Sequence, residues 1–348
     1  MSTAPPRIAV VRLLRGLGDM LCLVPALRSL RASMPDAHVT LFGVQQGRWM
    51  VERYPHLLDG FVQIDWWSGI PEADGKPRST KMTLKRISQQ RPYDLALQMH
   101  GTGPYINDLV EALHARSIAA HFPTGGAAPS LLCRPWPERG HEIHRLLGLV
   151  EALGCPRGCD RMEFPETAED RLLAAPLLGR LAGARFAVFH PGASTPVRQW
   201  SAAGFGEAAR LVHAAGLDIV VTGTATEREL AHRVRDHAGV HAFVAAGETT
   251  RGALGALLRR ASCVVANDTG VAHLAIATGA PTVVVHSTSD VERWGPLDRS
   301  RNAVVQVGRG PWSTTQIEAA AAQIAETAIQ RAMSSNSTSQ SARNRPSP

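Results

Sequence analysis

RIAVVRLLRGLGDMLCLVPALRSL, residues 7–30, decides the fold class of this chain. Its first part, residues 7–14, is an almost continuous apolar run, which is typical of a strand buried on both faces of a sheet. The apolar positions that follow recur at helical spacing, at Leu21, Val24, Leu27 and Leu30. A buried strand followed by a helix is the repeating unit of parallel α/β folds, so we expect this class.

The rest of the first half continues the alternation of strands and helices. Further strand-like runs occur at residues 38–43, 61–65, 93–99 and 117–122. Helical patterns lie between and after them, as at residues 107–114 and 142–153. The pattern predicts a Rossmann-like first domain over residues 1–165, with a doubly wound parallel sheet covered by helices on both faces.

The second half repeats the same pattern. Strands are predicted at residues 186–190, 218–222, 263–267 and 282–286, and helices at residues 205–213, 226–237, 254–260, 271–277 and 315–332. A chain of 348 residues is longer than one core usually supports. We therefore expect a second Rossmann-like domain over residues 184–332. Residues 333–348 are almost entirely Ser, Asn, Arg, Gln and Pro, a composition that predicts a disordered tail.

Composition narrows the partners and the location. The formal net charge of +7 favours anionic partners such as nucleotide diphosphates, phosphorylated glycolipids or the inner membrane surface. Nucleic acid is not expected, because the sequence has no aromatic-basic interleaving and no helix-turn-helix pattern. No run approaches the ~18 apolar residues of a membrane span, so a cytoplasmic location is expected. No cysteine or histidine spacing predicts a metal site.

Three loops that follow predicted strands carry candidate chemistry, because ligands of doubly wound sheets gather at the carboxyl ends of the strands. The first loop is residues 15–19, where two glycines precede Asp19 at the start of the next helix. A helix N-cap and a catalytic base are both compatible with Asp19. The loop lacks GxGxxG, so the dinucleotide-binding fingerprint is absent.

The other two loops lie in the second half. Residues 190–195 bring together small residues and the hydroxyls of Ser194 and Thr195, and Arg198 follows; a phosphate site and a simple turn with a surface arginine both fit. Residues 267–270 open the helix that carries His273. The backbone N–H groups at this helix start favour an anionic diphosphate, although capping by Asp268 explains the same residues and His273 could be a core histidine.

A basic cluster stands apart from these loops in the first half. Its members are Lys76, Arg78, Lys81, Lys85, Arg86 and Arg91. An ordinary solvated helix face and a surface that binds an anionic acceptor both remain open. For the second alternative, the candidate acceptor-binding residues are Lys81, Lys85 and Arg86.

Together, these loops resemble glycosyltransferase family 9, the lipopolysaccharide heptosyltransferase family. The resemblance rests on motifs in family order over most of the chain: RIAVVR at residues 7–12, LGD at 17–19, PAL at 25–27, HPGA at 190–193, Arg198 before Trp200, TG at 222–223 before Glu227, NDTG at 267–270 with His273-Leu274, and Asp290 before WGP at 294–296.

The resemblance implies a GT-B fold, with an acceptor-binding first domain, a nucleotide-sugar-binding second domain and a cleft between them. It assigns Asp19 as the base of an inverting transfer that needs no metal and no cofactor. It places Ser194 and Arg198 at the donor diphosphate and Glu227 at the nucleoside. Asp268, Thr269 and Gly270 are assigned to the donor sugar and diphosphate, and His273 is similar to a family histidine on the same helix.

The implied substrates are a nucleotide sugar and an anionic lipopolysaccharide-type acceptor at the inner membrane face. ADP-heptose is the expected donor. Two departures leave another nucleotide sugar open: the family commonly has lysine in place of Arg198, and an aromatic-Gly-Pro-Thr-Asp run in place of residues 286–290, HSTSD. A nucleotide-sugar epimerase of similar fold and a non-catalytic nucleotide-sugar binding protein are the alternatives.

Overall fold

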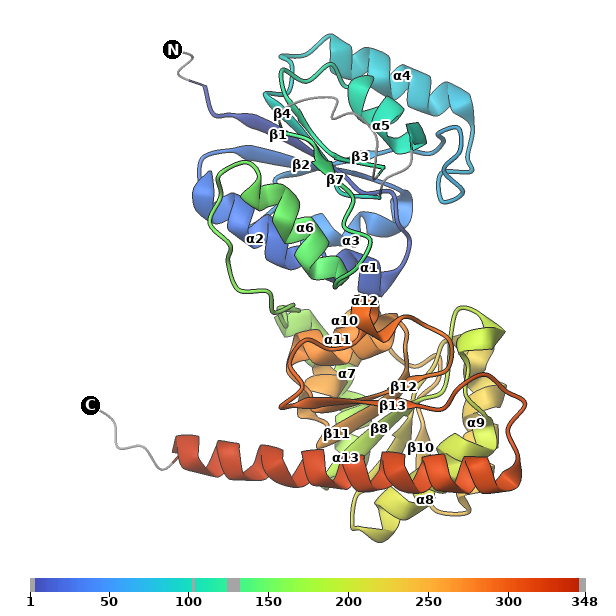
Figure 1. Ribbon diagram of the computed structural model, residues 1–348. Helices are drawn as coiled ribbons and strands as arrows, with labels where there is room; N and C mark the ends of the chain where they lie inside the picture. Colours follow the sequence, from blue (N-terminus) through green and yellow to red (C-terminus); the bar gives the residue numbers. More distant parts are fainter. Residues whose placement is uncertain (1–3, 102–103, 124–131, 344–348) are drawn as a thin grey trace. The chain divides into compact units, whose positions relative to one another are not determined.

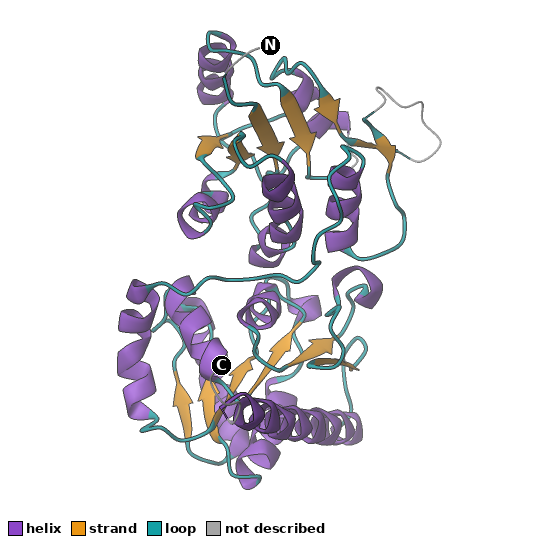
Figure 2. Ribbon diagram, turned by 90° about the vertical axis from the view of Figure 1, so that its left-hand side faces the viewer, coloured by secondary structure: helices purple, strands orange, loops and turns teal. Residues whose placement is uncertain are grey.

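The computed structural model describes residues 4–101, 104–123 and 132–343. The chain divides into two compact units, Met1–Met162 and Glu163–Pro348 (Figure 1). Each unit contains its own parallel sheet, with helices on both faces (Figure 2). The predicted α/β class is therefore confirmed.

The first unit is built on a five-stranded sheet in the order β3-β2-β1-β4-β5, and every pair in it is parallel. Its strands are β1 (Arg7–Val11), β2 (His38–Gly43), β3 (Gly60–Gln63), β4 (Leu95–Gln98) and β5 (Ile118–Ala119). Residues 8–11 of the central strand β1 are at most 1% exposed, as the apolar run at the start of the sequence predicts. The strand expected at residues 117–122 is interrupted, because β6 (His121–Phe122) leaves the sheet and pairs with β7 (Arg134–Pro135).

Helices cover both faces of this first sheet (Figure 1). They are α1 (Leu17–Leu21), α2 (Val24–Ser33), α3 (Trp49–Arg53), α4 (Pro77–Ser88), α5 (Pro104–Glu111) and α6 (Glu142–Glu151), with a 3₁₀ turn η1 (Gln45–Gly47). Ala9 and Val11 of β1 share one core cluster with Ile87 of α4 and with Leu109 of α5. The other face is covered by α2 and α6, which lie side by side.

The second unit has a six-stranded parallel sheet in the order β10-β9-β8-β11-β12-β13. Its strands are β8 (Phe186–His190), β9 (Asp218–Val221), β10 (Ala242–Val244), β11 (Cys263–Asn267), β12 (Thr282–His286) and β13 (Asn302–Gln306). Its helices are α7 (Ala168–Arg180), α8 (Ala202–Ala214), α9 (Arg228–Ala238), α10 (Arg251–Arg260), α11 (Gly270–Thr278), α12 (Val291–Trp294) and α13 (Thr314–Arg343), with 3₁₀ turns η2 (Pro196–Arg198) and η3 (Ala225–Glu227).

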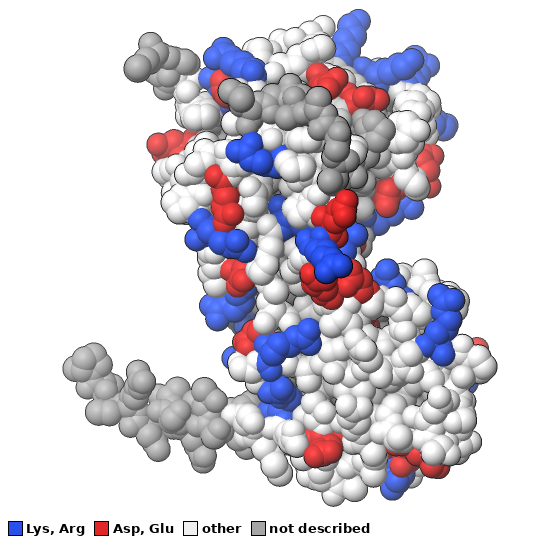
Figure 3. Space-filling model, viewed as in Figure 1, with Lys and Arg blue, Asp and Glu red and all other residues white. Residues whose placement is uncertain are grey.

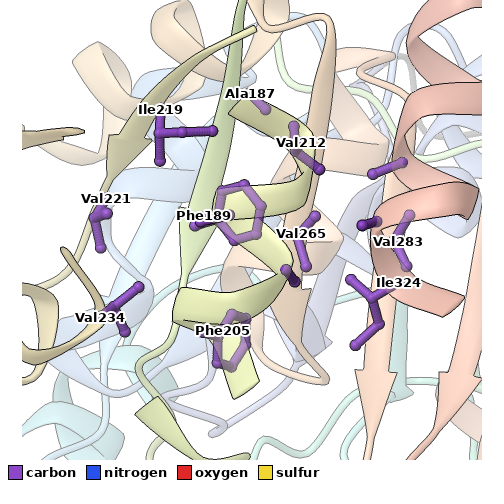
Figure 4. Packing of buried hydrophobic residues seen from close by; sticks show 14 of the residues in the cluster. Ala187, Phe189, Phe205, Val212, Ile219, Val221, Val234, Val265, Val283 and Ile324 are labelled. Atoms are coloured by element: carbon purple, nitrogen blue, oxygen red, sulfur yellow. The ribbon is translucent and has the colours of Figure 1, made fainter. Parts of the chain in front are cut away.

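The main core of the second unit lies between its sheet and helices α8, α9 and α13 (Figure 4). Phe189 and Val265 of the sheet pack there with Phe205 of α8, Val234 of α9 and Ile324 of α13. These side chains are fully buried. The central strands are thereby fixed in register, which places the loops at their carboxyl ends.

Two parts of the second unit differ from the sequence prediction. The pattern missed α7, β10 and β13, because α7 contains Pro176, β10 is short, and both strands are only partly buried. Helix α13 continues to Arg343, where a disordered tail is expected from Met333; no glycine or proline occurs between Thr314 and Arg343 to end the helix. Residues 344–348 of that tail lie outside the described residues.

The two sheets share one strand order, so each reverses its direction of winding beside its first strand. In the first unit this switch point lies between β1 and β4, and in the second between β8 and β11. Loops that follow such strands are the usual ligand sites of doubly wound sheets. Within the described residues, no helix is both long and apolar enough to span a membrane.

Candidate functional site

Asp19 lies at the switch point of the first unit, in the first turn of α1. The N-cap of α1 is Gly16, and Asp19 lies inside the first turn of the helix. The interpretation of Asp19 as the N-cap is therefore wrong. The Asp19 carboxylate lies instead directly over Gly16, where a Cβ would collide with Oδ2. It borders an open hollow of about 320 Å³ together with Arg15 and Glu72. The residue is half-buried, and it lines this open hollow.

Arg12 fixes the loop that carries Asp19, a function that the sequence did not reveal. Its side chain is fully buried at the end of β1. Its Nε donates a hydrogen bond to the backbone oxygen of Asp19 at 3.1 Å, and a second nitrogen donates to the oxygen of Met99 after β4. Glu142 at the start of α6 balances its charge, with 3.2 Å between Nη2 and Oε1. The only sequence signal for this role is a charged residue directly after a buried strand.

Asn267 connects the two switch-point loops of the second unit. Its side chain is fully buried at the end of β11. Its Nδ2 donates to the oxygen of Pro191 at 2.8 Å, and its Oδ1 accepts from the backbone N–H of Trp200 at 3.1 Å. The loop after β8 is therefore anchored at both ends by one amide. The sequence analysis placed Asn267 in a motif without predicting this function.

Ser194, Thr195 and Arg198 lie on the anchored loop and are exposed. Arg198 ends the turn η2, and its side chain makes no hydrogen bond or ion pair with any described residue. Ser287 and Thr288 after β12 hold this turn, since their hydroxyls donate to the oxygen of Val197 at 2.9 and 3.4 Å. A free guanidinium on a held turn can bind an anion without first breaking an ion pair.

Glu227 has a clear structural function in addition to any binding function. It forms a capping box with Thr224, in which Oε2 accepts from the Thr224 N–H at 2.7 Å. Its carboxylate also lies against Gly192, so that a Cβ at position 192 would collide with it. Glu227 thus joins the loop after β9 to the loop after β8.

Asp268, Thr269, Gly270 and His273 lie together where β11 passes into α11. Asp268 is buried, and Thr269 is the N-cap of α11 without a side-chain cap bond. The Nδ1 of His273 lies 3.1 Å from the oxygen of Thr269. The start of a nine-residue helix presents unpaired backbone N–H groups, which favour an anion.

Two buried histidines complete the edge of this sheet. Burial lowers the pKa of His190, at the end of β8, to about 4, against a smaller opposing effect of Glu227. Burial also lowers the pKa of His286, at the end of β12, although the nearby Asp268 carboxylate opposes this. Both rings are therefore neutral near pH 7 and contribute hydrogen bonds rather than charge.

The predicted acceptor residues Lys81, Lys85 and Arg86 are exposed on α4. Lys81 and Lys85 border an open hollow of about 570 Å³ with Arg78 and the exposed Met82. Figure 3 shows basic side chains gathered over the part of the first unit where Figure 1 places α4. Arg91 does not belong to this surface, because it pairs with Asp94 at 3.2 Å.

The family is established by a match over the second half of the chain and the end of the first. The model of glycosyltransferase family 9 (heptosyltransferase) matches residues 137–323. The chain belongs to this family. The resemblance inferred from the motifs is thereby confirmed.

Two curated relatives are similar to this family 9 glycosyltransferase. The lipopolysaccharide core heptosyltransferase OpsX of Haemophilus influenzae is 22% identical over 170 residues, which are 48% of each chain, so the match spans about half of that relative. Lipopolysaccharide heptosyltransferase 3 of Escherichia coli is 24% identical over 308 residues, 85% of this chain and 87% of that protein.

Solved structures support the fold of the family 9 enzyme. A family 9 glycosyl transferase from Veillonella parvula has a TM-score of 0.77 at 19% identity, covering 95% of this chain and 99% of that chain. E. coli heptosyltransferase WaaC with ADP has a TM-score of 0.67 at 20% identity, covering 92% and 100%. The iron-containing glycosyltransferase TibC of enterotoxigenic E. coli has a TM-score of 0.53 at 14% identity, covering 95% and 77%. The predicted GT-B class with two Rossmann-like domains is confirmed.

Proposed function

We propose that this chain transfers heptose from ADP-heptose to a hydroxyl of a lipopolysaccharide-core-type acceptor, with inversion and without a metal ion. The chain belongs to the heptosyltransferase family, and in its second unit Asn267 joins the loop after β11 to the loop after β8. This pair of joined loops is the observation that carries the proposal. That pair offers a free guanidinium and a helix start at one edge of the sheet. A nucleotide diphosphate is the ligand that such an edge suits best.

The donor is proposed to bind along this edge. The Arg198 guanidinium and the hydroxyls of Ser194 and Thr195 would bind the diphosphate, assisted by the N–H groups at the start of α11. Glu227 would contact the nucleoside. Asp268, Thr269, Gly270 and His273 would contact the sugar and the phosphate nearest to it. Curated relatives named as heptosyltransferases support heptose, and a similar structure solved with ADP supports the nucleotide.

The reaction is proposed as one in-line displacement. The acceptor oxygen forms a bond to the anomeric carbon while the bond from that carbon to the phosphate oxygen breaks. The acceptor proton passes to the Asp19 carboxylate, and the bonding electrons leave with the ADP oxygen. Arg198 and the helix start stabilise the negative charge that develops on the leaving diphosphate. No other participant is needed to balance the step.

The acceptor is proposed to be an anionic glycolipid at the inner face of the cytoplasmic membrane. Lys81, Lys85 and Arg86 are exposed and make no ion pair with a described residue, so their charges are available to it. The overall excess of positive charge favours the same class of partner. Each basic residue near an anionic surface contributes on the order of 1 kcal/mol to such binding.

The function is tested with Asp19→Asn, because an amide cannot take the acceptor proton. We expect transfer from ADP-heptose to fall by ~10²-fold or more, while ADP binding measured by calorimetry stays within about a factor of two. Asp36→Asn, at an exposed aspartate between α2 and β2, is the matched control and should transfer at the wild-type rate.

The alternatives give different results in the same experiment. Transfer at more than about a tenth of the wild-type rate in Asp19→Asn would refute the base assignment. A wild-type chain that converts a nucleotide sugar without an acceptor would be an epimerase. One that binds a nucleotide sugar but neither transfers nor hydrolyses it would be a binding protein.

A further inference from the structure

Three side-chain atoms without a hydrogen-bond partner gather at the carboxyl ends of β11 and β12. They are the Oγ1 of Thr269, the Nε2 of His273 and the Nε2 of His286, each of them buried and without a partner among the described residues. The rings of His273 and His286 are only 5% and 2% exposed. Buried polar atoms are nearly always paired in folded proteins, so three such atoms together indicate that a ligand completes them.

The ring of His286 is held by its Nδ1 side, and its Nε2 has no hydrogen-bond partner among the described residues. Its Nδ1 lies 2.8 Å from the Ser289 hydroxyl, and 3.9 Å from the Oδ2 of Asp268. The backbone N–H of Asp268 donates to the oxygen of Val285 at 3.0 Å, so the carboxylate and the ring are fixed side by side. With the Nδ1 side occupied, the unpartnered Nε2 is the atom that can bind a ligand.

The loop after β12 is tied to the loop that carries Arg198. Ser287 binds the oxygen of Val197, one residue before Arg198, and Asn267 binds both ends of the same loop. Strands β8, β11 and β12 are neighbours in the sheet, so their carboxyl ends converge. His286 therefore belongs to the edge at which the donor is proposed to bind.

The chemistry of this cluster suits a sugar better than a phosphate. Beside His286 lie its own neutral imidazole and the Asp268 carboxylate, so a phosphate fits there less well than at the helix start formed by Thr269 and Gly270. A carboxylate, a hydroxyl and two imidazole nitrogens together both donate and accept hydrogen bonds. Sugar hydroxyls need this mixture, because each of them is a donor and an acceptor at once.

We propose that His286 is a specificity-determining residue that binds a hydroxyl of the donor sugar through Nε2. The inference rests on the proposed function, since it takes a nucleotide sugar as the ligand. It deepens that function by naming the group that recognises the sugar rather than the nucleotide.

The test compares nucleotide with nucleotide sugar in His286→Phe, which keeps a planar ring and removes both nitrogens. Calorimetry measures Kd for ADP and ADP-heptose, and for UDP, ADP-glucose and UDP-glucose as a panel. We expect the ADP affinity to stay within about twofold and the affinity for the preferred sugar nucleotide to fall ~10-fold, the effect of one buried hydrogen bond. His286→Gln, which keeps a donor and an acceptor, should recover part of the loss. If His286→Phe does not fold, the same comparison of ADP with the sugar nucleotide is made with His286→Gln.

His232→Phe is the matched control. This histidine on α9 also has a buried, unpartnered ring nitrogen, Nδ1, but it lies outside the strand-end cluster. Its variant should bind every panel member like the wild type. An unchanged affinity for sugar nucleotides in both His286 variants, or equal losses for ADP and ADP-heptose, would overturn the inference. A wild-type preference for another sugar contradicts only the heptose assignment, and the same comparison is then made with that sugar.

Discussion

A single buried amide determines the geometry of the donor edge. Asn267 joins the end of β11 to Pro191 and Trp200, and no other side chain type offers the same donor and acceptor in so short a length. The sequence predicted which residues follow the strands, and hence Asp19, Arg198 and Asp268 as candidates. It could not predict partners far apart in the chain, such as Arg12 with Glu142, because residue type does not specify distance.

The buried histidines predict how stability depends on pH. Burial lowers the pKa of His100, His121 and His190 to about 4 from the usual 6.5. Between these two pKa values the unfolded chain binds more protons than the folded chain. The free energy of unfolding therefore has its maximal contribution from these histidines above pH 6.5 and decreases as the pH falls towards 4. For His190 alone the loss should reach about 3 kcal/mol.

The variant His190→Asn isolates one of these histidines, since an amide can still bind the Thr222 hydroxyl that lies 3.1 Å from Nδ1. Thermal unfolding measured across this pH range should show that the free energy of unfolding declines less steeply in the variant. The difference in slope should correspond to the binding of about one proton fewer on unfolding. Parallel curves for variant and wild type would mean that His190 does not titrate between the two states.

At the scale of elements, the sequence predicted those strands that are buried on both faces, because a continuous apolar run identifies them. It missed β10 and β13, whose positions are only partly buried, and α7, whose pattern is broken by Pro176. It also ended α13 too early, since polar composition alone suggested disorder. Periodicity thus predicts elements that lie in the core, and it fails at sheet edges and on the surface.

Packing between α8 and α9 predicts an unusual effect of alanine at a helical glycine. A Cβ at Gly206 would lie 2.5 Å from the Cβ of His237 and 2.9 Å from both the nitrogen of Ala238 and the oxygen of Val234. We expect Gly206→Ala to destabilise the second unit by about 1–3 kcal/mol, because backbone atoms of α9 cannot move aside freely. Gly179 in α7 has no atom within 4 Å of its Cβ position, so Gly179→Ala should stabilise by about 0.5–1 kcal/mol. Chemical denaturation measures both, and stabilisation by Gly206→Ala would contradict the packing.

Helix α4 predicts the effect of charge on acceptor binding. Reversing Lys81, Lys85 and Arg86 to Glu should raise the acceptor KM ~10-fold or more and weaken binding to anionic vesicles, both less so at high salt. The donor KM should stay within about a factor of two, because the proposed donor residues lie in the second unit. Reversal of the exposed Arg210 and Arg233 and the half-buried Arg235, on α8 and α9, is the control for the change in net charge. Equal changes in acceptor KM and in vesicle binding in the two triple variants would mean that the α4 residues do not bind the acceptor specifically.

At the scale of the whole molecule, two units repeat one strand order, and the second adds β13 at an edge. The chemistry is proposed to be distributed between them, with the base in the first and the diphosphate residues in the second. Within the described residues, no group of three or more His, Cys, Asp or Glu is placed to hold a metal ion. The proposed function assigns the neutralisation of the diphosphate to Arg198 and to the start of α11.

This assignment predicts the response to a chelator. Transfer in EDTA should stay within about a factor of two of the untreated rate, because a guanidinium and a helix start stabilise the leaving group. Arg198→Ala provides the matched comparison and should lose transfer with or without EDTA. A loss in EDTA that magnesium, manganese or iron restores would contradict metal independence.

Parallel pairing has a consequence for how the chain reaches its native state. All ten strand pairings in the described part of the chain are parallel. The partners in the central strands are distant in sequence: Ile8 pairs with Leu95, and Ala187 pairs with Cys263. Each closure of such a long loop costs entropy before the contacts compensate for it. Apolar strands such as β1 and β8 therefore stay exposed until late in folding. While they are unpaired, they are the segments most prone to aggregate.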